Sequence, residues 1–344
     1  MTHRPLPVAE VVGPPVEASD ALLAVEDLHV EFDADHGVVH AVEGVSFSVK
    51  AGQTVAILGE SGSGKSVTAR AIMGLTVGPK CRVTSGSIRF GSVDLLTLSE
   101  RERRRLRGSS LAMIFQDALS ALNPVLSVGY QIAEVFRIHQ HLSRKDARRR
   151  AIEMLDLVKI PAAASRVDHF PHQFSGGMRQ RVMIAMALAG DPELVIADEP
   201  TTALDVTVQA QIIELLMELQ ATRKMALVLI THDIGVVAEV ADRVVVMYAG
   251  RVAEQGPAKE ICNTPAHPYT RALLDSIPRP ELRGRPLPMI SGSPPDPMAM
   301  PDGCPFAPRC GYTSDRCLEA LPPSYSVIPG HASACHKWEA TREL

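Results

Sequence analysis

The feature that most constrains this chain is a glycine-rich turn between an apolar strand and a helix. The strand is predicted over 54–58 and the helix over 65–73, with Gly74 placed to end it. The turn reads Gly59-Glu60-Ser61-Gly62-Ser63-Gly64-Lys65-Ser66. Glycines let successive backbone N–H groups point inward, and the helix N-terminus adds partial positive charge. In this context we interpret the turn, together with Val67, as a P-loop that binds the phosphates of ATP.

Two acidic residues at the end of a second apolar strand complete the expected phosphate site. The strand is predicted over 194–197, and Asp198 and Glu199 follow it directly. A carboxylate at such a strand end can approach Mg²⁺, for which the Ser66 hydroxyl is a second ligand, while Lys65 supplies charge to the β- and γ-phosphates. The next carboxylate can hold the attacking water. We therefore expect Asp198 on the metal and Glu199 in catalysis.

The composition excludes several kinds of protein. Hydrophobic residues make up 46% of the 344-residue chain, and the formal net charge is −4, which disfavours a nucleic-acid backbone binder. The basic stretch at 101–107 lies beside acidic residues and is interpreted as a solvated helix face. We see no signal peptide, and no apolar run reaches the roughly 18 residues of a membrane helix. The sequence thus predicts a cytoplasmic chain without a nucleic-acid partner.

The order of predicted elements indicates an α/β fold with a mostly parallel sheet. Short β-type runs occupy 23–31, 38–49 and 54–58, and strands alternate with helices again after the long helix predicted over 178–189. The pattern is helical and charged between about 117 and 172, and we expect a helical subdomain over about 117–190. Such alternation predicts a parallel sheet covered by helices.

Changes in composition mark the expected domain limits. Residues 1–20 are rich in proline, valine and alanine without periodicity, and we interpret them as a disordered tail. Prolines and cysteines become dense from about Gly256 onward, where long periodic segments end. We therefore expect one nucleotide domain over 21–256 and a separate C-terminal extension over 257–344.

A second glycine-rich sequence precedes the helix predicted over 178–189. It reads Ser175-Gly176-Gly177-Met178-Arg179-Gln180. Glycines at a helix start expose free N–H groups, which makes a second anion site in a chain with one P-loop. This surface has nothing to bind unless another subunit brings a nucleotide to it. The sequence therefore predicts a dimer with ATP between one chain's P-loop and the other's Ser-Gly-Gly loop.

These motifs, in this order, resemble those of the ABC ATPase family. Gln116 matches the Q-loop glutamine, which in the family senses Mg²⁺ and the γ-phosphate and links to the transmembrane partner. Ala203-Leu204-Asp205 matches the D-loop, and His232 matches the switch histidine that contacts the γ-phosphate. The resemblance implies a RecA-like parallel sheet core with an N-terminal antiparallel β region and an inserted helical subdomain. It also implies a signature loop, Ser175, Gly176, Gly177 and Gln180, that contacts the partner's ATP.

Longer stretches resemble the oligopeptide/dipeptide importer ATPases. They are Met178 to Ala185, Asp198 to Thr207, His267-Pro268-Tyr269 and Cys304 to Cys310. The similarity covers nearly the whole chain from about Leu22. It implies a second, homologous ATPase chain, two permeases, an extracytoplasmic binding protein and a place at the cytoplasmic face of the membrane. Peptides are the implied cargo, with nickel, glutathione or another small solute as alternatives.

Two rival functions belong to other classes. One is a soluble ABC ATPase switch in DNA repair or translation, but such proteins typically carry two ATPase domains or a long coiled-coil insertion, and this chain has neither. The other is a regulatory subunit without catalysis, which predicts degraded motifs. Lys65, Asp198, Glu199 and His232 are all present.

The residue that stacks on adenine is not specified by a strong pattern. The family uses an aromatic residue from a loop near the N-terminus, where this sequence has no Tyr or Trp. We take Phe32 as the candidate, with His36 and His40 as rivals. A core position for Phe32 is an equally valid interpretation.

Four of the six cysteines crowd into the C-terminal extension. They are Cys304, Cys310, Cys317 and Cys335, separated by five, six and seventeen residues. Zinc ribbons and ferredoxin runs place their cysteines closer together, so spacing alone identifies no metal. The resemblance implies a [4Fe–4S] cluster on these four positions, with zinc or free or oxidised thiols as alternatives. Cys81 and Cys262 are interpreted as ordinary thiols.

Overall fold

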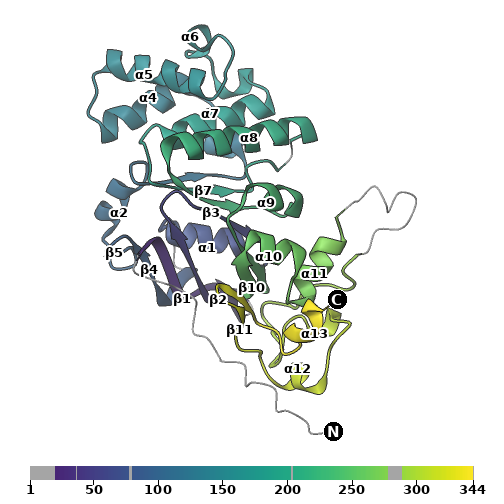
Figure 1. The fold of residues 1–344 in the computed structure, drawn as a ribbon. Helices are drawn as coiled ribbons and strands as arrows, with labels where there is room; N and C mark the ends of the chain where they lie inside the picture. Colours follow the sequence, from purple (N-terminus) through teal and green to yellow (C-terminus); the bar gives the residue numbers. More distant parts are fainter. Residues whose placement is uncertain (1–19, 36, 77–79, 203, 278–288, 344) are drawn as a thin grey trace, which may run out of the picture.

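The computed structural model describes residues 20–35, 37–76, 80–202, 204–277 and 289–343. Of the positions discussed above, residues 1–19 of the predicted tail, His36 and Ala203 lie outside this described part. Figure 1 shows a helical layer above a central sheet, with a second sheet and the C-terminal extension below it.

The strands of the described part form two sheets. One has four strands in the order β2-β1-β4-β5, and the other has eight in the order β11-β12-β10-β9-β3-β8-β7-β6. The strand bounds are β1 Ala21–Ala34, β2 Gly37–Lys50, β3 Thr54–Leu58, β4 Cys81–Phe90, β5 Val93–Asp94, β6 Leu111–Ile114, β7 Leu194–Asp198, β8 Ala226–Ile230, β9 Arg243–Tyr248, β10 Arg251–Pro257, β11 Tyr325–Ile328 and β12 His331–Ser333.

The helices of the described part follow the same chain order. Their bounds are α1 Lys65–Ile72, α2 Glu100–Leu106, α3 Ala118–Ala121, α4 Val128–His139, α5 Arg144–Leu157, α6 Ala163–Arg166, α7 Gly176–Leu188, α8 Val206–Arg223, α9 Ile234–Val240, α10 Ala258–Asn263, α11 Pro268–Asp275, α12 Asp315–Glu319 and α13 Trp338–Arg342. In this part of the chain, no helix is long and apolar enough to cross a membrane.

The middle of the larger sheet is parallel because its strands are continuous apolar runs. Every residue of β3, β7 and β8 is buried. Such strands need cover on both faces, which helices of a parallel sheet provide. Strand β3 pairs in parallel with β8 and β9, and β7 pairs in parallel with β6 and β8. All their carboxyl ends therefore meet at one edge, where α/β folds bind ligands.

The smaller sheet is antiparallel and has one face toward the core. Strand β1 pairs antiparallel with β2 and β4. Along β2, Val45, Phe47 and Val49 are buried and alternate with more exposed neighbours, as expected for a strand with one face in the core. The expected α/β class, with a parallel sheet core and an N-terminal antiparallel region, is confirmed.

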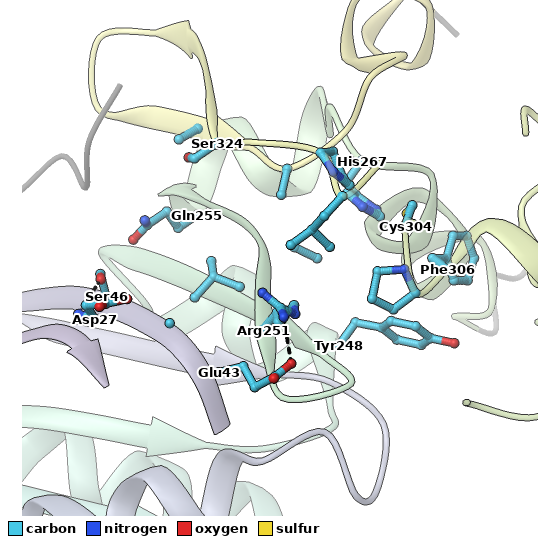
Figure 2. Close-up of a pocket in the computed structure, with 18 residues that line it drawn as sticks. Asp27, Glu43, Ser46, Tyr248, Arg251, Gln255, His267, Cys304, Phe306 and Ser324 are labelled. Atoms are coloured by element: carbon cyan, nitrogen blue, oxygen red, sulfur yellow. Dashed lines mark hydrogen bonds and ion pairs between the residues drawn. The ribbon is translucent and has the colours of Figure 1, made fainter. Parts of the chain in front are cut away.

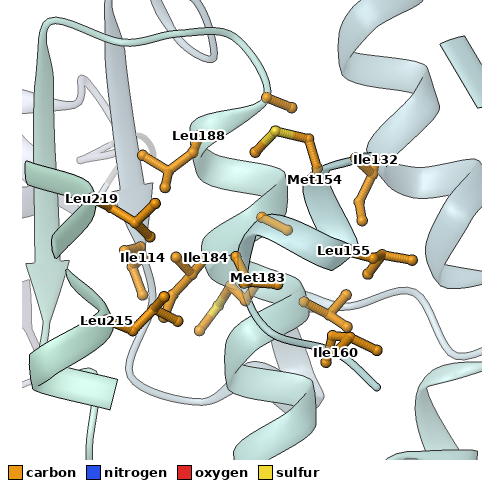
Figure 3. Packing of buried hydrophobic residues seen from close by; sticks show 14 of the residues in the cluster. Ile114, Ile132, Met154, Leu155, Ile160, Met183, Ile184, Leu188, Leu215 and Leu219 are labelled. Atoms are coloured by element: carbon orange, nitrogen blue, oxygen red, sulfur yellow. The ribbon is translucent and has the colours of Figure 1, made fainter. Parts of the chain in front are cut away.

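A layer of helices covers the part of the larger sheet that is formed by β6, β7 and β8. Helices α4, α5, α7 and α8 share one apolar cluster with strands β6 to β8. Figure 3 shows Met183 and Ile184 of α7 between Leu155 of α5 and Leu215 of α8. Because α7 is buried between its neighbours, the loop that precedes it is held on a rigid support.

The segment after Gly256 joins the main sheet. Strand β12 pairs antiparallel with β10, through Glu254 opposite Ser333 and Gln255 opposite Ala332. Buried His331 Nε2 lies 2.7 Å from Glu254 Oε1, which adds an internal polar contact. The composition predicted few regular elements here, but α10, α11, β11 and β12 form and pack onto the sheet edge.

Candidate nucleotide-binding site

The turn after β3 has a backbone shape that requires glycine at two positions. Gly59 and Gly64 have φ values of 154° and 96°. A Cβ added to Gly59 would lie 2.2 Å from the Met247 carbonyl oxygen, and one on Gly64 would lie 2.5 Å from that of Ala41. Helix α1 begins at the next residue, and no side chain caps its N-terminus. Its first N–H groups are thus free to face an anion.

Lys65 is held inside this loop. The residue is 4% exposed. Its Nζ donates to the carbonyl oxygens of Gly59 and Glu60 at 2.8 Å each. Burial lowers the pKa of Lys65, and the carboxylates of Glu199 and Asp198 oppose that shift.

Ser66 and Asp198 face each other at the end of β7. Ser66 Oγ donates to Asp198 Oδ1 at 2.8 Å. Asp198 is 2% exposed; burial raises the pKa of its carboxyl group, and the hydrogen bond from Ser66 opposes this shift. A hydroxyl and a carboxylate are oxygen ligands of the kind that Mg²⁺ prefers. These two residues therefore fit the metal role predicted for them.

Glu199 is the centre of a cluster drawn from three strand ends. Its Oε2 accepts hydrogen bonds from Thr202 Oγ1 at 2.8 Å and Gln116 Nε2 at 3.1 Å. His232 Nδ1 lies 3.6 Å from the same oxygen, and its side chain is 66% exposed. Gln116 follows β6, Glu199 follows β7 and His232 follows β8. The structure thus brings together Glu199, Gln116 and His232, which the sequence analysis named separately.

The backbone at Glu199 is strained. Its φ is 46°, in the left-handed region that residues other than glycine disfavour. The Glu199 N–H donates to the Ile230 carbonyl at 2.9 Å, and the Thr202 N–H donates to the Glu199 carbonyl at 3.2 Å. Strain held by such bonds is common at functional sites. The bend turns the Glu199 side chain away from the line of β7, toward Gln116 and His232.

The Ser-Gly-Gly loop lies on the outside of the helical layer. Ser175 is the N-cap of α7, where its side chain accepts from the Met178 N–H. Ser175 and Gly176 are exposed, whereas a Cβ on Gly177 would meet Val208 Cγ1 at 2.6 Å. Gln180, by contrast, is buried, and its Nε2 has no hydrogen-bond partner within the described chain. The loop therefore presents backbone N–H groups to solvent.

The D-loop residue Asp205 lies beside this surface. It caps α8 by accepting from the Val208 N–H at 3.0 Å. Val206, the first residue of that helix, is 81% exposed. Leu204, which precedes Asp205, would lie 3.4 Å from a Cβ on Gly176, so this turn and the Ser-Gly-Gly loop are neighbours.

A cavity lies beside the P-loop, on the side of the antiparallel sheet. Its volume is about 420 Å³. Phe32, Val39 and His40 line it together with Ser61 and Val67 of the loop and helix. Phe32 and His40 both reach this cavity, so both described candidates for stacking on adenine remain.

The four cysteines of the extension also come together. All are free thiols and line one small cavity of about 10 Å³ with His267 and His336. Burial raises the pKa of Cys304 and Cys310, and that of Cys335 to about 12. Soft thiol donors suit iron or zinc. However, in the described part of the chain no group of three or more His, Cys, Asp or Glu residues has an arrangement that could hold a metal ion.

A larger cavity separates this cysteine region from the antiparallel sheet. Its volume is about 330 Å³. Figure 2 shows Cys304, Phe306 and Tyr248 on one side of it and Asp27 and Ser46 on the other. Arg251 and Glu43, which also line the cavity, form an ion pair of 2.7 Å. The cavity is thus lined from both sides, by Cys304 and Phe306 of the extension and by Asp27 and Ser46 of the antiparallel sheet.

Two residues of this region were not found by sequence reasoning. Thr202, which bonds Glu199, lies in the Asp198-to-Thr207 stretch that the sequence analysis cited only for its likeness to a family. Arg309 reaches Glu60 of the P-loop, as described below, and lies 249 positions away in the sequence. Arg309 lies in the Cys304-to-Cys310 stretch, which was also cited only for its likeness to a family. Neither stretch carries a local pattern that names the contact partner.

The geometry defines a protein that binds a nucleoside triphosphate at a P-loop and places a carboxylate beside it. Comparisons with known proteins narrow this class. Residues 42–202 match the family described as "ABC transporter", and residues 253–317 match "Oligopeptide/dipeptide transporter, C-terminal region".

Curated relatives and a solved structure are also ATP-binding proteins by their names. The dipeptide transport ATP-binding protein DppD of Bacillus subtilis (strain 168) is 54% identical over 92% of this chain and 94% of its own length. The oligopeptide transport ATP-binding protein OppD of Escherichia coli (strain K12) is 49% identical over 93% and 94%. A dimeric structure of the ATP-binding cassette MJ0796 bound to ADP and Pi superposes with a TM-score of 0.62 at 28% identity, over 69% of this chain and 98% of that one. The chain belongs to the ATP-binding proteins of ABC transporters, in the oligopeptide/dipeptide branch, and is an ATPase that uses ATP and Mg²⁺.

Proposed function

We propose that the chain is the ATP-hydrolysing motor of a membrane importer for di- and oligopeptides. The observation that carries this proposal is the joint presence of a complete P-loop site and a C-terminal region of the oligopeptide/dipeptide type. The names of the relatives support peptides as cargo. In the proposed organisation, residues 21–256 form the ATPase domain with a helical subdomain over about 117–190, 1–20 a tail and 257–344 the extension.

In the proposed reaction, Glu199 acts as the general base. Its carboxylate would hold and polarise the water that attacks the γ-phosphate, while Lys65 and His232 stabilise the charge that develops there. Bound Mg²⁺ would neutralise phosphate charge, held by Ser66, Asp198 and the Gln116 amide. The hydrogen bond from Gln116 to Glu199 supports this arrangement, because it keeps the amide and the base together at one strand edge. P-loop residues 59–67 would bind the phosphates, with Phe32 on the base.

The second half of each catalytic site is proposed to come from another ATPase chain. The exposed N–H groups at Ser175 and Gly176 would bind the γ-phosphate of that partner's ATP, with Gly177 and Gln180 supporting the loop. Asp205 and the exposed Val206 would lie at the contact. The dimeric state of the MJ0796 structure supports such pairing.

The remaining partners follow from the proposed transport role. Two permease subunits would carry the cargo across the membrane, and an extracytoplasmic binding protein would deliver it. The chain itself would lie at the cytoplasmic face, attached through the permeases, with the Gln116 region passing closure of the ATPase dimer to them. We propose no nucleic-acid partner.

For the cysteines of the extension we propose a [4Fe–4S] cluster, with zinc as the alternative. The support is that four thiols line one cavity. The thiols would have to rearrange around the group, because their present arrangement is not that of a metal site. Protein purified without oxygen should contain iron and acid-labile sulfide. Zinc alone, or neither metal, would contradict the cluster.

Transport itself tests the proposed function. Uptake of labelled di- to pentapeptides, with labelled nickel alongside, should be measured in cells that lack this chain and carry wild type or Glu199→Gln. We expect peptide uptake to be lost without the chain and to return with wild type alone. Unchanged peptide uptake would contradict the peptide assignment, and loss of nickel uptake in its place would identify a different cargo for the same motor.

A further inference from the structure

One arginine of the C-terminal extension reaches into the nucleotide site. Arg309 directly precedes Cys310, and its side chain is 4% exposed. Its Nη1 lies 2.7 Å from Glu60 Oε2, and its Nη2 lies 3.0 Å from Glu60 Oε1. This is a bidentate pair, the strongest and most directional form of a carboxylate contact. The residue that it holds is the second residue of the P-loop.

The backbone of Glu60 is fixed at both of its polar groups. Its N–H donates to the hydroxyl oxygen of Tyr269 at 2.8 Å, and its carbonyl accepts from Lys65 Nζ at 2.8 Å. Tyr269 belongs to α11 and is fully buried, and burial raises the pKa of its hydroxyl, so this group stays neutral. Two residues of the extension, Arg309 and Tyr269, therefore bond Glu60, and the carbonyl of Glu60 in turn accepts a hydrogen bond from the Lys65 ammonium group.

Arg309 also donates to the backbone of a second segment, at two adjacent residues. Nε donates to the Ser291 carbonyl at 2.9 Å, and Nη2 donates to that of Ile290 at 3.4 Å. The segment that starts there continues to Pro294, Pro295, Pro297 and Met300, which line the same cavity as Phe32 and His40. Arg309 thus links the P-loop to the segment that walls the base cavity.

Aromatic rings hold the guanidinium in this position. Its Cζ lies 5.8 Å from the ring centroid of Tyr248 and 5.9 Å from that of Phe306, and Nη1 donates to the Tyr248 hydroxyl at 3.2 Å. Figure 2 shows Tyr248 and Phe306 side by side. Between them, the three nitrogens of Arg309 donate to Glu60, Tyr248, Ser291 and Ile290. A lysine has neither the planar fork nor enough donors to replace this set.

We propose that Arg309 is a positioning residue for ATP binding: it fixes Glu60 and the wall of the base cavity, so that the C-terminal extension sets the affinity of the P-loop for nucleotide. The proposal rests on the proposed ATP-binding role of this loop. Arg309 touches no phosphate in this account and acts through Glu60 and the 290–300 segment. Its loss should therefore weaken binding and leave the chemical step nearly unchanged.

The test compares Arg309→Gln with Arg316→Gln in the full-length chain. Arg316 also belongs to the extension and also directly precedes a cysteine, but it bonds Tyr325 and not the P-loop. We expect Arg309→Gln to raise the KM and the Kd for ATP about tenfold, the scale of breaking a buried ion pair in part, with kcat within about twofold. Arg316→Gln should change none of these by more than about twofold. Equal effects of the two substitutions would contradict the proposal.

A double-mutant cycle with Glu60→Gln separates positioning from general support. On the Glu60→Gln background, Arg309→Gln should change the Kd by clearly less than tenfold, because only its link to the 290–300 segment is left to lose. The same tenfold effect on both backgrounds would overturn the link through Glu60. Thermal unfolding reports whether each variant folds, and Arg309→Lys and Glu60→Gln carry the test if Arg309→Gln does not fold. Wild-type chain that failed to bind ATP would refute the proposed function, whereas normal binding by every Arg309 variant would refute this inference alone.

Discussion

The two anion-binding loops of this chain differ in how far the chain itself completes them. Around the P-loop, Lys65 and Asp198 are buried, and each has a hydrogen-bond partner inside the protein. At the other loop, Ser175 and Gly176 are exposed, and Val206 beside them is 81% exposed. The difference teaches that one half of a catalytic site is organised within the chain. We propose that the other half is an exposed surface, which a nucleotide bound to a second chain completes.

The largest expected effect concerns the base at the organised half. Glu199→Gln should lower ATP hydrolysis by about a thousandfold, because the water loses its proton acceptor, while the Kd for ATP changes little. Phosphate release and equilibrium ATP binding measure the two quantities. Glu193→Gln removes the same charge from an exposed residue just before β7 and should leave hydrolysis unchanged. Hydrolysis near the wild-type rate in Glu199→Gln would remove Glu199 from the chemistry.

A negative charge in the Ser-Gly-Gly loop should lower ATP hydrolysis but leave ATP binding at the chain's own P-loop unchanged. Gly176→Asp adds a Cβ that would meet Leu204 Cδ2 at 3.4 Å, an ordinary contact, so folding should persist. The carboxylate would repel a partner's phosphates and lower hydrolysis by about a hundredfold. The Kd for ATP at the chain's own P-loop should stay within about twofold. Gly176→Ala is the uncharged control, and weaker ATP binding in Gly176→Asp would break the separation of the halves.

The reverse pattern is expected at the P-loop lysine. Lys65→Met should weaken ATP binding about thirtyfold, which corresponds to ~2 kcal/mol for a lost charge-assisted contact. Titration calorimetry with ATP and Mg²⁺ gives this value, and Lys145→Met on the exposed face of α5 serves as the control. If Lys65→Met bound ATP as wild type does, the buried ammonium would have no role in binding.

The smallest expected effect is at the base cavity. Phe32→Leu keeps an apolar side chain but removes the ring, and should weaken ATP binding about fivefold, the scale of a single aromatic stacking contact. Phe170→Leu, in the helical layer, should leave binding unchanged. If Phe32→Leu bound ATP as wild type does and His40→Ala bound it more weakly, the stacking role would belong to His40.

The sequence predicted the local parts of this fold well. The strand predicted over 54–58 matches β3 residue for residue, and the strand predicted over 194–197 ends one residue before β7 does. Continuous apolar stretches and a glycine-rich turn carry their own structural signal, so the P-loop and the strand end at Asp198 could be found without a structure. From the sequence, Gln116, Glu199 and His232 were named one by one. The structure shows that they meet, because each follows one of three neighbouring parallel strands.

Contacts between distant segments could not be predicted in this way. The pairing of β12 with β10 depends on short strands in a proline-rich segment, whose composition favours loops. The contact of Arg309 with Glu60 joins residues that no periodicity connects. The left-handed backbone at Glu199 is set by bonds to Ile230 and Thr202, and not by its own residue type. In each case tertiary contacts override the local signal.

One measurement tests most directly whether the outer loop completes another chain's site. A photo-reactive amino acid in place of Gly176, in a Glu199→Gln chain that retains ATP, would be irradiated in the assembled transporter with and without ATP and Mg²⁺. We expect a crosslink that depends on ATP and joins this chain to a P-loop peptide of a second ATPase chain. A crosslink to the chain's own P-loop, or one that forms equally without ATP, would contradict the shared site.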